Sequence, residues 1–492
     1  MALTVPCMKP VKTFQRQLQG FLWKSFFCIS TVDIVKVKPP KKIRRKKQNM
    51  KAFDESMSWE DRLADAVTPL WRLSYDEQLH IKQQNQENIL KQFSSKLSHL
   101  ILAQQSPVVN DTSGFSVLPI MPSPVRDCYR NKSTFSVNKG VDGNPKTVGF
   151  YVGTGRDRNI ICVNGDHLLN MPEKHKQVAR CYQEFIRLSP LDSCLLFHKG
   201  GHWREVTVRT NAKGHTMVIV YFHPQTLVPE EIAIHKQALV DYFTKGPGAI
   251  CELYSLFFQE TSMTRCDHEE SPYQLLYGQA HIHEELLSFK FRISPDAFFQ
   301  VNTAAAEVLF TVAREMCFPE GAADRVGGTL LDVCCGTGAI GITLSPAVEQ
   351  VVGVELVPQA VEDARHNAAL NGVLNCQFLA GKAEVILPRI VPQLSSSEEG
   401  SGGGGVVALV NPARAGLHYR VVRALRNQPD VRRLVYVSCK PDGEAMRNFI
   451  ELCCPPDPQK KLTGEAFTPR VAVPIDMFPH TQHCELVLLF ER

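Results

Sequence analysis

Apolar runs and amphipathic stretches alternate regularly along the second half of the chain. Strand-like runs, separated by segments with apolar residues at helical spacing, lie at 329–334, 350–355, 375–380, 406–410 and 433–438. Strands and helices in this alternation form a mostly parallel sheet with helices on both of its faces. Two further apolar runs, at 470–475 and 484–490, predict strands that complete the sheet. We therefore expect an α/β domain over 281–492.

The first half of the chain has a different pattern. We expect 51–146 to be a helical and linker segment, because helical spacing runs from 54 to 102. This pattern has Lys and Gln between the members of a broad apolar stripe, which are Leu79, Ile81, Ile89, Leu90, Phe93, Leu97 and Leu100.

Over 147–280 we expect a mixed α+β subdomain with an antiparallel sheet. Strand-like runs there alternate with turns and helix-like segments, and they lie at 148–152, 205–209 and 216–221. A further helix is predicted from Thr303 to Met316.

The net charge of +5 is unevenly distributed along the chain. Residues 1–50 hold twelve Lys or Arg and one acid, Asp33, so this segment carries +11 and the remainder −6. A start rich in Lys, Arg, Phe and Ser and almost free of acids is typical of a mitochondrial presequence. We therefore expect a presequence at 1–50 and a location in the mitochondrial matrix. The alternatives are a disordered basic tail and, because of the basic cluster at 41–47, a nuclear signal or an RNA-binding arm.

Two classes of protein are not indicated. The chain has no run of eighteen apolar residues, so we expect no membrane span. Its sixteen cysteines are irregularly spaced and none form Cys-x-x-Cys, which suits neither a zinc site nor a disulfide framework. We therefore expect no metal and no iron–sulfur cluster.

A glycine-rich turn follows the strand predicted at 329–334. Glycines in Gly336-x-Gly338-x-x-Gly341 let a backbone approach a bound nucleotide closely. The next predicted strand ends in Glu355, where an acid can hydrogen-bond ribose hydroxyls. The turn fits a dinucleotide fingerprint, and it also fits an S-adenosylmethionine turn, in which an acid such as Asp332 closely precedes the first glycine. A purely structural turn is the third alternative.

Side chains that could take part in binding or catalysis follow two other predicted strands. Asn411-Pro412-Ala413-Arg414 follows the strand at 406–410, and Cys439 follows the strand at 433–438. Because ligands in parallel sheets bind at the carboxyl ends of strands, these residues and the glycine turn should converge. A reactive cysteine needs electropositive surroundings, which the adjacent Lys440 could provide, whereas a small buried cysteine is the alternative. Asn411 could bind a base edge and Arg414 a phosphate, or both could belong to an ordinary turn.

Three other stretches have two interpretations each. Glu485 could act as a general base if it is desolvated, or it could be a solvated acid at a strand start. The segment 129–132, Tyr-Arg-Asn-Lys, could contact RNA or pack as a loop. The segment 298–302 holds two phenylalanines and two amides, which could line a flat ligand or cap the next helix.

Taken together, these stretches resemble the RNA (uracil-5-)-methyltransferase family. The matching segments are 129–132, 294–302, 332–338, 411–417, 438–441 and 476–485. With the basic start, the chain is similar to mitochondrial members of that family in vertebrates. The resemblance implies a class I S-adenosylmethionine-dependent methyltransferase, with a Rossmann-like sheet and an N-terminal α+β part that docks RNA.

The resemblance also implies roles for individual residues. Gln300, Glu355 and Asn411 match cofactor-binding positions, Cys439 matches the nucleophile, and Glu485 matches the base. Addition of a thiolate to uracil C6 makes C5 nucleophilic, and a base must then remove the C5 proton. The expected reaction is methylation of uridine C5 in mitochondrial tRNA, in the T-loop, with mitochondrial ribosomal RNA as a further or alternative substrate.

The chain departs from the family pattern at two positions. The family usually has Asp where Asn411 stands and Asn where Lys440 stands. Both changes make the surroundings of Cys439 more positive, which could favour the thiolate, or could weaken cofactor binding and slow turnover.

Three alternative functions follow. A catalytically weak or inactive RNA-binding or folding protein is consistent with these departures. A nicotinamide-dependent dehydrogenase would use the glycine turn but would leave Cys439 and Glu485 without a role. Methylation of an exocyclic amine ranks lowest, because Arg414 stands where such enzymes have an aromatic residue.

Overall fold

The computed structural model describes residues 56–103, 115–153, 160–195, 200–261, 271–319, 328–394 and 405–492. The expected presequence at 1–50 lies outside these residues. Residues from Met57 to Arg492 form one compact unit. In the described part of the chain, no helix combines the length and apolar character needed to cross a membrane.

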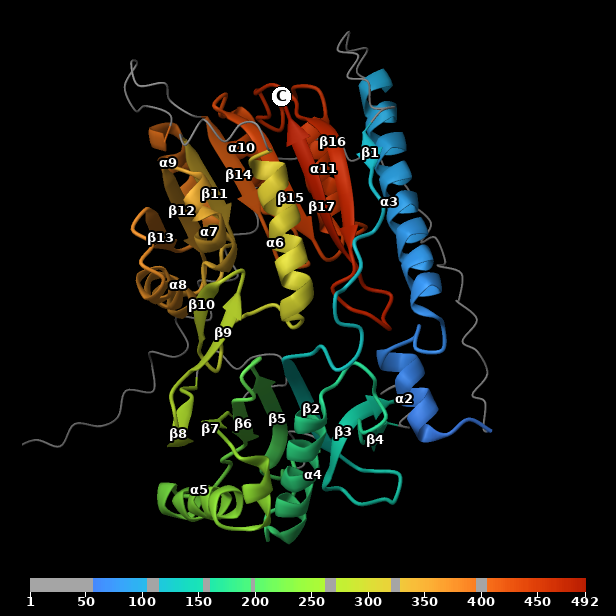
Figure 1. Ribbon diagram of the computed structural model, residues 1–492, viewed down its shortest axis with the longest axis vertical. Coiled ribbons are helices and arrows are strands. Elements are labelled where there is room, and N and C mark those ends of the chain that lie inside the picture. Colours follow the sequence, from blue (N-terminus) through green and yellow to red (C-terminus); the bar gives the residue numbers. More distant parts are fainter. Residues whose placement is uncertain are drawn as a thin grey trace, which may run out of the picture. The chain divides into compact units, whose positions relative to one another are not determined.

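An eight-stranded sheet has the order β1–β16–β17–β15–β14–β11–β12–β13 (Figure 1). Its strands are β1 (Ser116–Val117), β11 (Thr329–Val333), β12 (Gln350–Glu355), β13 (Cys376–Ala380), β14 (Val406–Val410), β15 (Val431–Ser438), β16 (Thr468–Ile475) and β17 (Glu485–Glu491). The neighbours from β13 to β15 all pair in parallel, which confirms the expected mostly parallel sheet. Strand β17 is antiparallel to both β15 and β16. Its connection to β16, residues 476–484, is shorter than the roughly twelve residues that a parallel crossover needs.

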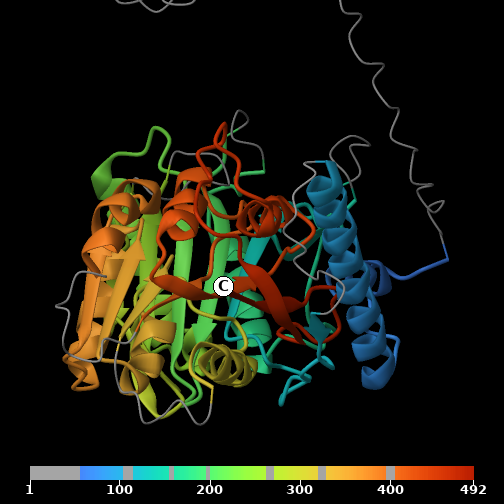
Figure 2. The same cartoon turned by 90° about the horizontal axis from the view of Figure 1, so that it is seen from above.

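Helices cover both faces of this sheet (Figure 2). One face packs against α6 (Thr303–Cys317), α7 (Ala339–Leu344) and α8 (Pro358–Leu370). The other face packs against α9 (Ala383–Leu394), α10 (Tyr419–Asn427) and α11 (Glu444–Cys453). Alternate strand residues serve the two faces, since Leu330 belongs to the first cluster and Leu331 to the second. This arrangement explains why the strands appear in the sequence as continuous apolar runs.

A seven-stranded sheet has the order β4–β3–β2–β5–β6–β7–β8. Its strands are β2 (Lys132–Asn138), β3 (Thr147–Val152), β4 (Ile161–Val163), β5 (Trp203–Thr210), β6 (Thr216–Phe222), β7 (Ser255–Glu260) and β8 (Gln274–Gly278). The helices α4 (Glu173–Leu188) and α5 (Pro229–Thr244) share a core with one of its faces. The expected antiparallel sheet is wrong at one pair, because β6 and β7 run parallel. Helix α5 connects them as a crossover, which brings the chain back to the same end of the sheet.

A hairpin follows the seven-stranded sheet in the chain. It consists of β9 (Ile282–Leu286) and β10 (Phe289–Ile293), which pair antiparallel. Leu286 and Phe291 share a hydrophobic core cluster with Met217 of β6 and Leu309 of α6. The hairpin is therefore packed between the two sheets and precedes the segment that enters α6.

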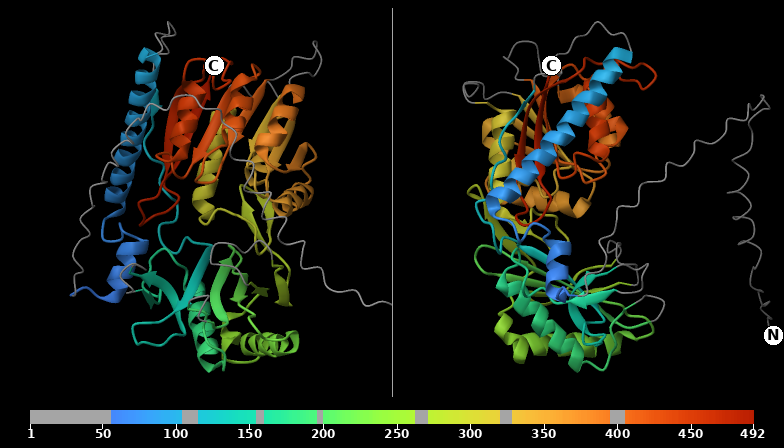
Figure 3. Two further views of the ribbon diagram at one scale, coloured as in Figure 1. Left: turned by 180° about the vertical axis from the view of Figure 1, so that it is seen from behind. Right: turned by 90° about the vertical axis from the view of Figure 1, so that its right-hand side faces the viewer.

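The expected helical region at 54–102 forms two helices. Helix α2 (Trp59–Val67) packs on the seven-stranded sheet, and α3 (Tyr75–Ala103) lies along the β1–β16 side of the eight-stranded sheet (Figure 3). The apolar stripe is correct only in the second half of α3, where Leu90, Phe93 and Leu97 are buried.

The first half of α3 has a polar buried face. Its buried residues are Gln78, Lys82 and Gln86, and Lys82 is 0% exposed. A helical periodicity predicts burial only for positions that have apolar side chains. These polar residues are buried because distant parts of the chain provide hydrogen-bond partners for Gln78 and Lys82, as described below.

Candidate active site

A cavity of about 980 Å³ lies at the carboxyl ends of β12, β11, β14 and β15. Neighbouring parallel strands end at the same edge of a sheet, so the residues that follow them converge there. The lining includes Gly336 of the glycine turn and five residues singled out from the sequence, Gln300, Glu355, Asn411, Cys439 and Glu485. The first comes from the segment before α6, and the last is the first residue of β17.

Two glycines of the turn serve different purposes. Gly336 has φ +55°, and a Cβ atom there would meet nothing within 4 Å, so its backbone faces open space in the cavity. Gly338 has φ +77°, and a Cβ atom there would lie 2.9 Å from the ring of Phe378. Only the first therefore leaves room for a ligand, whereas the second allows the helix to pack closely on the sheet.

The two acids next to this turn have different surroundings. Asp332 is fully buried and its Oδ2 accepts a hydrogen bond from the Gly341 N–H at 3.0 Å. Burial raises the pKa of Asp332 to about 7. Glu355 faces the cavity, and its two oxygens accept hydrogen bonds from the N–H groups of Gly336 and Val357, each at 3.0 Å. Asp332 therefore holds the turn together, whereas Glu355 is available to a ligand.

The segment 298–302 caps α6, as one of its interpretations expects, and it also lines the cavity. Asn302 is the N-cap of α6, because its Oδ1 accepts a hydrogen bond from the Ala305 N–H at 3.1 Å. Phe299 is buried in the core, whereas Phe298 is 67% exposed and lines the cavity with Gln300. One aromatic ring therefore supports the helix and the other is free for a flat ligand.

The segment 129–132 also has a divided role. Tyr129 is buried, and Asn131 binds the chain before α6 through its Nδ2, which donates to the Gln300 carbonyl at 2.8 Å. Arg130 is half-buried and lines the cavity. Asn131 thus fixes the backbone of Gln300, and Arg130 places a positive charge on the cavity wall.

Cys439, Glu485 and Arg414 form an electrostatic group at one end of the cavity lining. Burial raises the pKa of Glu485 to about 7, and Arg414 lowers it. Burial also raises the pKa of the Cys439 thiol, as does the Glu485 carboxylate, whereas Arg414 lowers it. Glu485 is 5% exposed, so it is not a solvated acid at a strand start. One guanidinium therefore stabilises the charged forms of both groups.

The sequence did not indicate this role of Arg414. Lys440, the cation adjacent to Cys439 in the chain, is exposed and is not among the residues that line the cavity. The sequence suggests a phosphate contact or an ordinary turn for Arg414, although its position after β14, next to β15 in the sheet, also suggests proximity to Cys439. His483 is another cavity residue that the sequence did not single out, and burial lowers its pKa, which favours the neutral imidazole.

The described residues contain no cluster of three or more His, Cys, Asp or Glu side chains arranged to hold a metal ion. The cavity lining brings together a thiol, a desolvated carboxyl and a guanidinium with Gly336 and an exposed aromatic ring.

Comparison with known proteins gives relatives that are described as tRNA (uracil-5-)-methyltransferases. A family model described as tRNA (uracil-5-)-methyltransferase matches residues 273–492. The chain is 61% identical over 490 residues to the tRNA (uracil-5-)-methyltransferase homolog B of Danio rerio, covering 100% of this chain and 98% of that protein. Against the homolog B of Homo sapiens it is 57% identical over 437 residues, covering 88% and 84% respectively.

A solved structure also resembles the chain. It is the crystal structure of the Pyrococcus abyssi tRNA (uracil-54, C5)-methyltransferase in complex with S-adenosyl-L-homocysteine, with a TM-score of 0.57 and 22% sequence identity. The match covers 86% of this chain and 84% of that one. At this level of identity the similarity concerns the fold.

Proposed function

Because the chain belongs to the tRNA (uracil-5-)-methyltransferase family, we propose that it methylates C5 of a uridine in the T-loop of mitochondrial tRNA. In this proposal S-adenosylmethionine is the methyl donor, Cys439 is the nucleophile and Glu485 is the base. The observation that carries this proposal is that Cys439, Arg414 and Glu485 line the same cavity as the glycine turn. Family membership leaves the nicotinamide-dependent dehydrogenase without support.

The cavity suits S-adenosylmethionine. Gly336 offers backbone that a ligand can approach, and Glu355 retains acceptor capacity for ribose hydroxyls because a carboxylate has about four lone-pair positions. Leu356 and Val357, exposed by 58% and 43%, line the cavity and offer apolar surface to a flat base. When bound there, S-adenosylmethionine supplies a methyl group carried on a positively charged sulfur.

The residues of the chain would perform the remaining chemistry. The thiolate of Cys439 would bond to uracil C6, and the electron pair of the C5–C6 double bond would move toward C5, which accepts the methyl group while the electron pair of the broken methyl–sulfur bond stays on sulfur. Glu485 then takes the proton from C5. The electron pair of that C–H bond restores the C5–C6 double bond, and the sulfur leaves C6 as a thiolate. A carboxyl whose pKa is near 7 is suited to accept this proton at neutral pH.

The wall of the cavity supports an RNA substrate. A base inside a folded tRNA is out of reach of Cys439, so the uridine must leave its stack. Phe298 is exposed and can stack on an unstacked base, and Arg130 can contact the backbone near it. The Pyrococcus abyssi enzyme with a similar fold is named for uracil 54, which supports the T-loop as the target. Mitochondrial ribosomal RNA is proposed as a second substrate.

A covalent trap tests the proposed chemistry. The full chain is mixed with S-adenosylmethionine and tRNA that contains 5-fluorouridine, and the products are separated on a denaturing gel. Fluorine at C5 cannot leave as a proton, so the adduct with Cys439 should persist as a retarded band, and the band should be missing for Cys439→Ala. The same trap with mitochondrial ribosomal RNA tests the second substrate. If no band forms although S-adenosylmethionine binds, the inactive RNA-binding alternative replaces the proposal.

The proposed location has its own test. Residues 1–50 carry a charge of +11, which is typical of a presequence. In the experiment this segment is fused to a reporter protein. The fusion should enter mitochondria, and a variant with the basic residues before 25 replaced by Gln should not. Retention of the unaltered fusion in the nucleus would favour the nuclear signal instead.

A further inference from the structure

The segment that joins β16 to β17, residues 476–484, leads directly to Glu485. Its own residues Phe478, Thr481 and His483 line the cavity with Glu485. The position of this segment therefore determines where the carboxyl group points. An irregular segment of this kind has no ladder of strand hydrogen bonds to fix it, so the groups that bind its backbone decide its conformation.

Four successive carbonyl groups of this segment are bound by four different parts of the chain. The carbonyl of Met477 accepts from Asn302 at 3.1 Å, and that of Phe478 accepts from the Lys82 ammonium at 3.0 Å. The next two carbonyls, of residues 479 and 480, accept from the Tyr129 hydroxyl at 3.1 Å and from the Leu70 N–H at 2.9 Å. Three of these four donors belong to the chain before residue 130.

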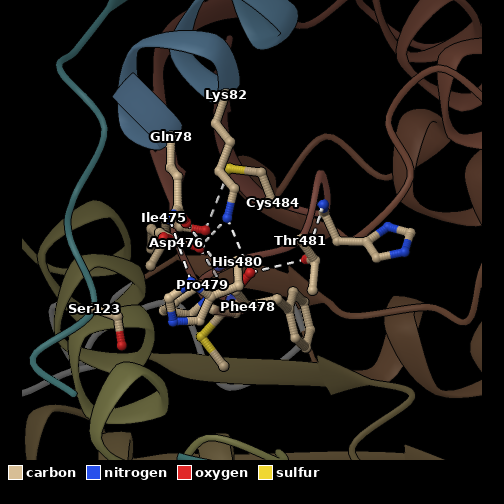
Figure 4. A network of polar contacts seen from close by, with 12 residues as sticks. Gln78, Lys82, Ser123, Ile475, Asp476, Phe478, Pro479, His480, Thr481 and Cys484 are labelled. Carbon is tan, nitrogen blue, oxygen red and sulfur yellow. Dashed lines mark hydrogen bonds and ion pairs between the residues drawn. The ribbon is translucent and has the colours of Figure 1, made fainter. Parts of the chain in front are cut away.

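The contact with Lys82 is a buried ion pair (Figure 4). Its Nζ lies 2.5 Å from Oδ1 of Asp476, and both side chains are 0% exposed. The same Oδ1 accepts a hydrogen bond from the Phe478 N–H at 3.1 Å. Desolvation of two charges offsets most of their attraction, so such a pair contributes little to stability compared with apolar residues of the same size. It does fix one relative position of α3 and the segment.

Gln78, one turn before Lys82 on α3, binds His480 at two points. Its Oε1 accepts from the His480 N–H at 2.7 Å, and its Nε2 lies 3.3 Å from the ring Nδ1. The other ring nitrogen lies 2.6 Å from Oδ1 of Asp127. His480 has φ +68°, a conformation that residues other than glycine rarely adopt. The backbone at this point is therefore held in place by its partners.

We propose that α3 positions the catalytic base: Lys82 and Gln78 hold the segment 476–484 so that Glu485 reaches the C5 proton of the target uridine. They are positioning residues, because neither lines the cavity. This inference rests on the proposed role of Glu485. Cys439 directly follows β15 and does not belong to the segment 476–484, so nucleophilic addition should depend less on α3 than proton removal does.

The test separates the two steps of the reaction. Lys82→Met removes the ammonium but keeps a similar length, and Glu485→Gln serves as the reference for loss of the base. Each full-length variant is mixed with S-adenosylmethionine and ordinary tRNA, and the covalent adduct is quantified on a denaturing gel over time. The amount of 5-fluorouridine adduct formed by the same preparation gives the number of protein molecules that are able to form the covalent adduct, which we call competent sites.

We expect Lys82→Met to accumulate adduct on ordinary tRNA, as Glu485→Gln does, with release at least tenfold slower than in the unaltered protein. Its 5-fluorouridine adduct should form to the same level per folded molecule. Leu90→Ala is the matched control, because it weakens the packing of the same helix without contacting the segment. This variant should release its adduct at the unaltered rate per competent site.

If Lys82→Met does not fold, Gln78→Leu provides the same test, because it removes both contacts with His480 and leaves no buried charge. Release at the unaltered rate in the folded variants overturns the inference, and so does slow release in Leu90→Ala. If the unaltered protein forms no 5-fluorouridine adduct, or if Glu485→Gln releases normally, the proposed function itself fails. These outcomes are therefore distinguishable.

Discussion

Arg414 influences two groups of the cavity at once. Its charge lowers the pKa of the Cys439 thiol and that of the Glu485 carboxyl, against the effect of burial on both. Asn411, three residues before Arg414, is an amide and adds no charge of its own to the cavity.

Replacement of Arg414 by Gln should raise the pKa of Cys439. The thiolate would then form only at higher pH, so the pH profile of Cys439 alkylation should move upward. Because Arg414 is exposed, solvent screens its charge, and adduct formation should slow by up to about fivefold. Rates of iodoacetamide labelling, corrected with Cys439→Ala, measure the shift. Arg420→Gln, an exposed change outside the cavity, is the control and should leave the profile in place.

Glu485 should reduce stability at neutral pH. Its pKa is about 7 in the folded chain and near 4.5 in the unfolded chain, so the folded state binds this proton more tightly. The free energy of unfolding therefore falls as pH rises from 4.5 to 7, by up to about 3 kcal/mol for this group.

The variant Glu485→Gln should be inactive but more stable than the unaltered protein at pH 8, by up to about 3 kcal/mol. At pH 4.5 the two should differ little. Urea unfolding at both pH values measures the difference, with the exposed Glu465→Gln as control. Equal stability at pH 8 would mean that the carboxyl is not desolvated.

Among the elements, α6 links two segments that line the cavity. Its N-cap Asn302 accepts from the Ala305 N–H and donates to the Met477 carbonyl and the Ser123 hydroxyl, each at 3.1 Å. The helix start therefore fixes the segment before it, which carries Gln300, and the segment that leads to Glu485.

Asn302→Ala should cost about 2–4 kcal/mol, because it removes a helix cap and leaves a buried carbonyl without a donor. Asn302→Ser keeps an acceptor for the cap but cannot reach both other partners, so its loss should be smaller. Denaturant unfolding gives both values. A Ser variant as unstable as the Ala variant would show that the cap contributes little.

The same elements show what sequence patterns can and cannot predict. The strands from β11 to β15 are predictable because burial on both faces leaves continuous apolar runs, and the carboxyl-end rule then brings Glu355, Asn411 and Cys439 together. The burial of Lys82 is not predictable in this way, since its counterion lies 394 residues away in the chain. The effect of Arg414 on Glu485 likewise depends on the position of β17, which only the sheet order provides.

At the scale of the whole molecule, the compact unit begins at Met57 and contains every residue named in the cavity. A chain that starts at Met57 should therefore keep its melting temperature and its yield of 5-fluorouridine adduct. A chain that starts at residue 115 lacks α2 and α3, exposes the rings of Phe115 and Phe449 that Phe93 contacts, and should not form a cooperative fold. Thermal unfolding and the adduct assay compare the two. If the shorter chain still formed the adduct, α2 and α3 would not be needed for the fold.

The ion pair between Lys82 and Asp476 also imposes an order on biosynthesis. Helix α3 leaves the ribosome early, but the residue that neutralises its buried ammonium is made 394 residues later. At about 5–20 residues per second, that interval is roughly 20–80 s. Until then, burial of the Lys82 ammonium would leave its charge unpaired, which disfavours docking of α3. A nascent chain therefore cannot complete the cavity before the segment 476–484 and Glu485 have been made.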